Sequence, residues 1–176
     1  MDIATTTEPK SDQQNFDDYQ AAPKTVTVTE VKKGSAEQPV EVHLAEFPGR
    51  PFKPSKSMRR VLVAAWGGEA SNYPGRILRL YGDPTVKFGG QTVGGIRISH
   101  MSHLTEPVTV HLTVTRGKRA PFTVQPLATP GDATAWLHDS VTLDDLQRVW
   151  GMVQRAGLGS IAELAELKDK RKAELG

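Results

Sequence analysis

Residues 76–101 read RILRLYGDPTVKFGGQTVGGIRISHM, and this stretch decides the fold class because apolar and polar side chains alternate along it. In its first part, Leu78 and Leu80 share one face, whereas Arg79 and Tyr81 share the opposite face. A period of two residues is typical of a half-buried β-strand. The stretch therefore predicts three short strands, over 76–82, 84–90 and 92–101.

The second and third of these strands continue the alternation. Val86 and Phe88 are predicted to point inward, so that Lys87 points outward. Ile96 and Ile98 are predicted to anchor the third strand in the core. The opposite face of that strand is small and cationic, since it carries Gly95, Arg97 and Ser99.

Two glycine pairs divide the same stretch. Gly89–Gly90 predicts a tight hairpin turn. Gly94–Gly95 lies inside a strand, which predicts a bulge, a sharp bend or the close approach of another chain. Neither pair belongs to a phosphate-binding loop, because the chain contains neither G-x-G-x-x-G nor G-x-x-x-x-G-K and no helix follows the glycines.

His100 and His103 form an H-x-x-H pattern that resembles a metal-binding motif. Residues three apart on a strand point to opposite faces, so the pattern suits a metal only on a helix or a turn. The nearest carboxylate in the sequence is Glu106, and no cysteine is present. The two histidines are therefore interpreted as surface or core residues, and no metal site is expected.

Further strands are predicted on both sides of this stretch, at intervals typical of a small sandwich or barrel. Residues 57–66 favour a short helix with Val61, Leu62 and Trp66 on its apolar face, although the β-branched residues there leave a strand as the alternative. The predicted fold is mainly β, a small OB-like or Greek-key barrel. The further strands cover residues 25–33, 40–44, 107–117 and 120–127.

The C-terminal residues predict a helical hairpin, which makes the expected fold α+β overall. Thr142 is an N-cap candidate with acids in the first turn of its helix. Ser160 and Glu163 form a second capping-box pattern. The hairpin is too small for a full core of its own, so it is expected to pack on the barrel or on a partner. The apolar face expected to bind a partner consists of Leu146, Val149, Trp150 and Val153.

Residues 1–24 are rich in Asp, Gln, Thr and Pro and lack any period, so they predict a disordered acidic tail. Within this tail, FDDY (Phe16 to Tyr19) is either a solvated patch, a docking peptide, or a mimic of DNA that competes for a basic surface. The predicted domains are the tail over 1–24, a basic β-barrel over 25–130 and a helical interaction element over 131–176.

The charges of the chain are segregated, although the formal net charge of its 176 residues is only +2. Residues 50–119 hold twelve Lys or Arg and three acidic residues, which gives this segment a net charge of +9. The rest of the chain is acidic. Such segregation favours a polyanionic partner for the centre, with a scattered solvated surface as the alternative.

Composition excludes or disfavours several other classes of protein. The absence of cysteine excludes disulfides and cysteine nucleophiles and is typical of a reducing cytoplasm. The chain shows no signal-peptide pattern, and no apolar run approaches the ~20 residues of a membrane helix, so a cytoplasmic protein without a membrane segment is expected. The acids Glu69, Asp83 and Glu106 stand in unrelated contexts and no G-x-S-x-G is present. Neither enzymatic activity nor a cofactor is expected.

Cations interleaved with aromatic residues on the outward strand faces predict a surface for single-stranded nucleic acid. Such surfaces combine a cationic track for the backbone with rings that stack on bases. A polar face that serves solubility alone normally mixes both signs of charge, and acids are scarce here. The predicted nucleic-acid-binding residues are Arg59, Arg60, Trp66, Arg76, Arg79, Tyr81, Lys87, Arg97, Arg116, Lys118, Arg119 and Phe122.

Residues 56–100 resemble a class of proteins from phages of actinobacteria, thought to be encoded near replication and recombination genes. The likeness rests on K-x-M-R-R, a W-G step, G-R-x-L-x-L-Y-x-D-P-T-V-x-F-G-G and V-G-G-I-R-I-S-H, and TVTRGKRAPFTVQPL at 113–127 extends it. The resemblance implies an OB-like single-stranded DNA-binding or recombination-accessory protein. The chain departs from typical bacterial single-strand binders, since it ends in KAELG instead of an acidic tip with an aromatic. The positions that match are Arg59, Arg60, Arg76, Arg79, Tyr81, Lys87, Arg97, Lys118 and Arg119.

Two functions follow from these observations. The first is a non-enzymatic phage protein in the host cytoplasm that binds single-stranded DNA, with a replication or recombination protein as a further partner. The second is an interaction or virion-assembly module whose C-terminal helices form a homo-oligomer. The sequence leaves open the preference for DNA over RNA.

Overall fold

The structure is a computed structural model that describes residues 12–176. These residues form a mixed α+β fold in two compact units, which divide between Gln125 and Pro126. The predicted boundary, after residue 130, lies slightly further along the chain. Each unit has a hydrophobic core of its own. Residues 1–11 of the predicted disordered tail lie outside the described residues.

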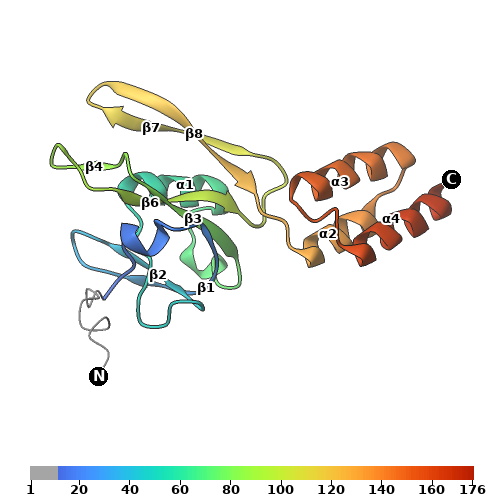
Figure 1. Ribbon diagram of the computed structural model, residues 1–176, viewed down its shortest axis with the longest axis horizontal. Helices are drawn as coiled ribbons and strands as arrows, with labels where there is room; N and C mark the ends of the chain where they lie inside the picture. The colour runs from blue at the N-terminus through green and yellow to red at the C-terminus, as the bar shows by residue number, and fades with distance from the viewer. Residues whose placement is uncertain (1–11) are drawn as a thin grey trace. The chain divides into compact units, whose positions relative to one another are not determined.

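An open six-stranded sheet forms the frame of the first unit (Figure 1). The strands lie in the order β2-β1-β3-β6-β8-β7, and β1–β2, β1–β3, β3–β6 and β7–β8 are antiparallel pairs. All six correspond to predicted strands. Their bounds are β1 Lys24–Lys33, β2 Val40–Leu44, β3 Ile77–Asp83, β6 Gly95–Met101, β7 Val108–Thr115 and β8 Lys118–Pro126.

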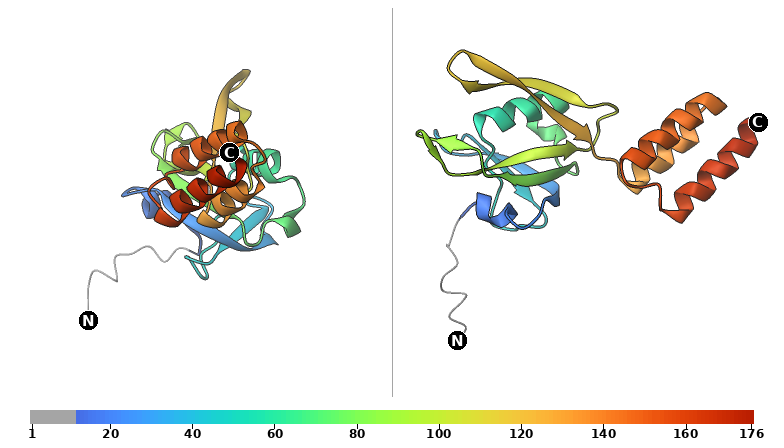
Figure 2. Two further views of the ribbon diagram at one scale, coloured as in Figure 1. Left: turned by 90° about the vertical axis from the view of Figure 1, so that its right-hand side faces the viewer. Right: turned by 45° about the horizontal axis from the view of Figure 1, so that its top comes forward.

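The expected closed barrel is wrong. The edge strands β2 and β7 stand at opposite ends of the sheet order and do not pair within residues 12–176, and an OB-like fold is not confirmed. Instead, helix α1 (Lys56–Trp66) packs against β6 and β7 of the sheet, and Figures 1 and 2 show it next to the β7–β8 hairpin. The helix predicted over 57–66 is thereby confirmed, and its alternative as a strand is wrong.

The core of the first unit lies between α1 and the sheet. Met58 and Leu62 of α1 are buried together with Leu78, Leu80 and Ile98 of the strands. Each such side chain contributes about 1.5–3 kcal/mol when it is fully buried. A helix laid on an open sheet therefore supplies the core that barrel closure was expected to supply. The inward faces predicted for β3 and β6 are confirmed.

Residues 12–23 fold onto the sheet, so the prediction of disorder is wrong for this part of the tail. FDDY forms a short 3-10 helix, η2 (Phe16–Tyr19), and Tyr19 is only 2% exposed. The Tyr19 hydroxyl donates to the side chain of Gln14, which is itself buried. Asp18 accepts hydrogen bonds from both terminal nitrogens of Arg50, at 3.0 and 2.8 Å. Burial and this charged pair oppose the conformational entropy lost when the segment becomes ordered.

The ring of Phe16 fills the space left by two glycines of the sheet. A Cβ atom at Gly94 would lie 2.6 Å from the ring, and one at Gly82 would lie 3.0 Å from it. Gly94 also has a φ of 74°, a conformation that L side chains rarely adopt. Close approach of another chain was one of three alternatives predicted at this glycine pair, but here the close contact is made by the N-terminal segment of the same chain, and Gly94 lies just before β6 and not inside it. FDDY is a docked segment and not a solvated patch.

The second unit consists of three helices, α2 (Pro130–Asp139), α3 (Leu143–Arg155) and α4 (Ala162–Leu175), so the predicted two-helix hairpin is wrong. The missed helix α2 begins at a capping box, in which Thr129 and Asp132 exchange hydrogen bonds of 2.8 and 3.1 Å. Thr142 caps α3 as predicted, since its hydroxyl accepts from the backbone NH of Asp145. The N-cap of α4 is Ile161, so the capping box predicted at Ser160 does not form.

Candidate functional site

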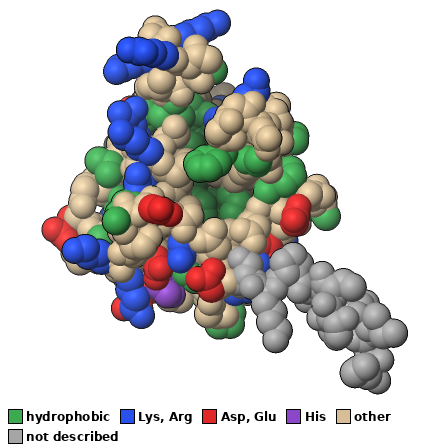
Figure 3. Space-filling model, turned by 90° about the vertical axis from the view of Figure 1, so that its left-hand side faces the viewer, with side chains coloured by type: hydrophobic (Ala, Val, Ile, Leu, Met, Phe, Trp, Pro, Cys, Tyr) green, Lys and Arg blue, Asp and Glu red, His purple; other side chains and the backbone are tan. Residues whose placement is uncertain are grey.

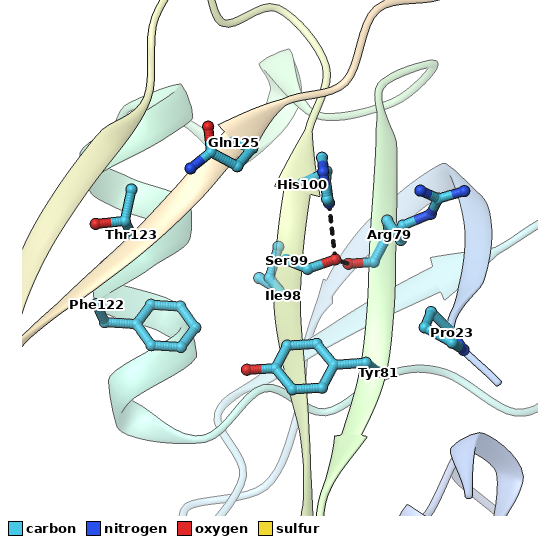
Figure 4. A pocket seen from close by; sticks show the side chains of 9 residues that line it. All are labelled: Pro23, Arg79, Tyr81, Ile98, Ser99, His100, Phe122, Thr123 and Gln125. Atoms are coloured by element: carbon cyan, nitrogen blue, oxygen red, sulfur yellow. Dashed lines mark hydrogen bonds between the residues drawn. The ribbon is translucent and has the colours of Figure 1, made fainter. Parts of the chain in front are cut away.

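An open groove of about 460 Å³ lies over β3, β6 and β8 in the first unit (Figure 4). Figure 4 shows the rings of Tyr81 and Phe122 pointing toward each other from the two sides of β6. Between them lie short polar side chains and one histidine. The residues that line the groove are Pro23, Arg79, Tyr81, Ile98, Ser99, His100, Phe122, Thr123 and Gln125.

Strand alternation and one irregularity of pairing place these side chains. Leu80 is buried in the core, and so its neighbours Arg79 and Tyr81 lie on the outward face, as predicted. The pairing shifts between Arg79 and Leu80, which leaves Ser99 as an extra residue on β6. A bulge of this kind re-aims the side chains beside it. The Ser99 hydroxyl donates to the Arg79 carbonyl at 3.2 Å, and Nδ1 of His100 lies 2.9 Å from the Ser99 hydroxyl.

Arg97 is held between an acid and a ring at one end of the groove. Its Nε lies 2.8 Å from a carboxylate oxygen of Asp83, and its guanidinium lies over the ring of Phe122, 5.4 Å from the centroid. The pKa of Asp83 is lower than its usual value. Burial acts to raise it, but the hydrogen bonds from Thr85 and the charge of Arg97 together outweigh that effect. Arg97 is therefore a partner that orients Phe122, and its charge is already balanced in part.

Tyr81 and His100, which line the groove, both favour their neutral forms. Burial raises the pKa of Tyr81 above its usual value of 10.0, although Arg97 acts in the opposite direction, so the phenol keeps its proton and can donate a hydrogen bond. Burial and the charge of Arg79 lower the pKa of His100 below 6.5. The positive charge of the groove itself therefore comes from Arg79.

The tip of the β7–β8 hairpin carries a second group of cations. Arg116, Lys118 and Arg119 are all exposed, and Figure 3 shows Lys and Arg side chains gathered at the top of the face where this hairpin projects. Among residues 12–176, neither these three nor Arg79 and Lys87 form an ion pair with a carboxylate. Unpaired cations on a strand face and on an adjacent hairpin form a surface that attracts anions.

Trp66 does not take part in this surface, so its prediction as a base-stacking residue is wrong. The indole is 6% exposed, and its Nε1 donates to the Ser102 carbonyl at 2.8 Å. Tyr73 meets the ring edge-on, and the guanidinium of Arg76 lies 5.3 Å from the ring centroid. Arg76 therefore covers the core at Trp66 and is not part of the groove.

The remaining predicted cations are spread over other elements. Arg59 is half-buried and Arg60 is exposed on α1, and neither lines the groove. Lys87 lies on a separate ribbon formed by β4 (Lys87–Phe88) and β5 (Gln91–Thr92). Ser99 and His100 line the groove but were not among the predicted site residues, although strand alternation places Ser99 on the same face as Arg97.

The apolar face predicted to bind a partner is used inside the second unit. Leu146, Val149 and Val153 are buried with Leu137 and Leu164 in a core made by α2, α3 and α4. Trp150 packs against the same cluster, and Lys168 lies 5.0 Å from its ring centroid. The prediction of an external partner is wrong because α2, which was not predicted, packs its own apolar residues against this face of α3.

Residues 12–176 contain no cluster of His, Asp or Glu that could hold a metal ion. His103 has a φ of 58° and its Nδ1 lies 2.9 Å from the Ser102 hydroxyl, whereas His100 faces the groove, so the two histidines make separate contacts. No helix of these residues is both long and apolar enough to cross a membrane.

No family model, curated protein or solved structure matches this chain. The resemblance to phage proteins stays a prediction, and any assignment of function depends on the groove and its surrounding charges.

Proposed function

We propose that the first unit binds single-stranded DNA along the groove over β3, β6 and β8. One observation carries this proposal: two aromatic side chains, Tyr81 and Phe122, face each other in an open groove that is lined by Arg79, a cation without a carboxylate partner within residues 12–176. Proteins that bind single strands combine rings that stack on bases with cations that follow the backbone.

The two rings provide the base contacts in this proposal. Stacking of a base on an aromatic side chain is worth about 1–3 kcal/mol and tolerates any base, because every base has a π-face. Arg97 lies over Phe122 and limits the freedom of that ring before a base arrives. Ser99, Thr123 and Gln125 offer hydroxyl and amide groups to the edges of a stacked base.

Cations at the edges of the groove provide the backbone contacts. Figure 4 shows the guanidinium of Arg79 directed away from the two rings, a position that suits a phosphate better than a base. Arg116, Lys118 and Arg119 on the β7–β8 hairpin continue the positive track. Each phosphate contact releases counterions, so affinity falls with salt by a slope of about 0.7 per contact for a single strand.

Fluorescence anisotropy with labelled oligo-dT at two salt concentrations tests the proposal. The Arg79→Gln, Lys118→Gln double variant is expected to reduce the salt slope by about 1.4, the sum for two lost contacts. Lys170→Gln with Lys172→Gln removes the same charge from exposed positions of α4 and is expected to leave the slope unchanged. Failure of the wild-type protein to bind at about 10 µM in low salt refutes the proposal, since non-specific binders normally reach that range.

Variants of the rings separate stacking from simple attraction of charge. Tyr81→Leu is expected to weaken binding about 5- to 150-fold, which corresponds to the loss of one stacked base, whereas Tyr81→Phe keeps the ring and most of the affinity. Equal affinities of Tyr81→Leu and Tyr81→Phe contradict the role of the ring. A parallel titration with oligo-U determines the preference between DNA and RNA.

The cellular setting that we propose is the one implied by the resemblance, replication or recombination of a phage genome in the host cytoplasm. A replication protein or a second copy of the chain is then a further partner. The alternative of an assembly module loses its main support, because the apolar face on which it depends is buried in the second unit.

A further inference from the structure

The β4–β5 ribbon presents an aromatic side chain to solvent. Phe88 is 81% exposed, next to the turn at Gly89 and Gly90, which have φ values of 58° and 82°. The prediction that Phe88 points into the core is wrong. The glycine turn closes a two-stranded ribbon that is separate from the six-stranded sheet, so the core does not reach this ring.

The base of this ribbon is firmly attached to the sheet. The backbone NH groups of Val93 and Gly94 both donate to the Val86 carbonyl at 3.0 Å. Asp83 accepts hydrogen bonds from the NH and the hydroxyl of Thr85, at 2.9 and 2.6 Å. The Val86 side chain packs so closely on Gly95 that a Cβ atom there would lie 2.9 Å from it. The ring is therefore held out from a fixed base.

One face of the ribbon is apolar and the other is cationic. Lys87 pairs with Thr92, and Phe88 pairs with Gln91, so Phe88 and Lys87 point to opposite faces. Val93, which is 52% exposed, adds to the apolar surface of the ribbon. An exposed ring on a fixed hairpin, with an exposed cation on the opposite face, has the composition of a base-stacking contact.

The charge around the ribbon favours an anionic partner. Residues 84–131 contain one acid, Glu106, and five cations. Figures 1 and 2 show the ribbon and the β7–β8 hairpin projecting in the same direction from the first unit. The five cations are Lys87, Arg97, Arg116, Lys118 and Arg119.

We propose that Phe88 is a second base-stacking site for the same single strand that occupies the groove; this inference rests on the proposed function. Strand β6 connects the two sites. From Arg97, which lies over the Phe122 ring of the groove, to Thr92 on the ribbon is five residues, a distance of at most about 17 Å at ~3.3 Å per residue. At about 3.4 Å per nucleotide of stacked strand, about five nucleotides are needed to span it. A short oligonucleotide therefore reaches one site only, and a longer one reaches both.

The test compares dT4 and dT12 by anisotropy against the wild-type protein, Phe88→Ala, Phe88→Tyr and Val63→Ala. The last variant is a matched control, because Val63 is a 53% exposed apolar residue of α1. Phe88→Ala is expected to weaken dT12 binding about 5- to 150-fold and to change dT4 binding less than twofold. Phe88→Tyr is expected to restore dT12 binding, and Val63→Ala to match the wild-type protein.

Each other outcome overturns the inference in a recognisable way. If Phe88→Ala binds dT12 as tightly as the wild-type protein does, the second stacking site is refuted and the proposal for the groove stands. Equal losses for dT4 and dT12 show that Phe88 acts on the fold or on the groove. Unchanged dT12 binding with a loss of binding to vesicles that contain phosphatidylserine assigns Phe88 to a membrane surface. Absence of any wild-type binding removes the proposed function itself.

Discussion

Replacing Gly94 with alanine tests whether the N-terminal segment is docked on the sheet. Gly94 has a φ of 74°, and an alanine there costs about 1–2 kcal/mol in backbone strain alone. The new Cβ atom would also lie 2.6 Å from the Phe16 ring, so the ring must leave its site. Phe16 is only partly buried, so moving its ring into solvent costs less than the full burial energy of a phenylalanine, about 1–2 kcal/mol. Gly94→Ala is therefore expected to lower the free energy of unfolding by about 2–4 kcal/mol.

A double-mutant cycle with Phe16→Ala separates the two contributions. Without the ring the added methyl group meets no clash, so Gly94→Ala in the Phe16→Ala background should cost only the strain of about 1–2 kcal/mol. Gly90 is a matched control, because its φ is 82° and a Cβ atom there would meet nothing within 4 Å. Gly90→Ala should therefore cost the same strain and show no coupling to Phe16.

Urea unfolding followed by circular dichroism measures all of these variants. The expected coupling between Gly94→Ala and Phe16→Ala is about 1–2 kcal/mol, well above the usual error of such cycles. Equal costs for Gly94→Ala and Gly90→Ala, with no coupling to Phe16, would refute the docking of FDDY on β3 and β6. The disordered tail expected from composition would then describe the protein better.

Three further predictions concern the groove and the two cores. The pKa of His100 is lower in the folded protein than its unfolded value of 6.5, so the unfolded chain binds this proton more tightly. The free energy of unfolding should therefore fall as the pH drops below about 7. In urea titrations between pH 5 and 8, His100→Gln should make this dependence on pH weaker. Trp66→Phe leaves the Ser102 carbonyl without its donor and should cost about 1–3 kcal/mol of stability, yet leave DNA affinity unchanged. A loss of affinity in the folded variant would contradict the structural role of Trp66. Val153→Ala removes two buried carbon atoms and should cost about 2 kcal/mol in the second unit only; hydrogen exchange that speeds up equally in both units would argue against separate cores.

Local patterns were enough to predict the strands and their faces. Apolar and polar residues alternate with a period of two in these strands. This alternation alone predicts that Leu78, Leu80 and Ile98 are buried and that Arg79 points outward. The tight turn at Gly89–Gly90 follows from the same kind of local signal. Predictions of this kind succeed because each depends on neighbours within a few positions.

Predictions that depend on distant contacts failed. No local signal shows that Phe16 will occupy the space over Gly94, about eighty positions away in the chain. The number and spacing of the strands predict a barrel, but they carry no information about α1, which covers the open sheet. The apolar face of α3 likewise predicts a partner, but α2 of the same chain buries it. The capping box at Thr129 and the proline that follows it, Pro130, are local signals for the start of that helix.

The pairing of charges in the folded chain sharpens the interpretation of the basic centre. Arg50 and Lys53 belong to that block, but both pair with acids, Asp18 and Glu41 respectively, in the N-terminal part of the chain. Some of the excess charge read from the sequence is therefore internal to the fold. Among the cations of the block without a carboxylate partner within residues 12–176, Arg79 lines the groove, and Lys87, Arg116, Lys118 and Arg119 lie on the ribbon and the β7–β8 hairpin. The others, Lys56, Arg59, Arg60 and Arg76, lie away from the groove, on α1 and over Trp66. A solvated surface gives no reason for unpaired cations to lie beside aromatic rings, whereas a bound single strand does.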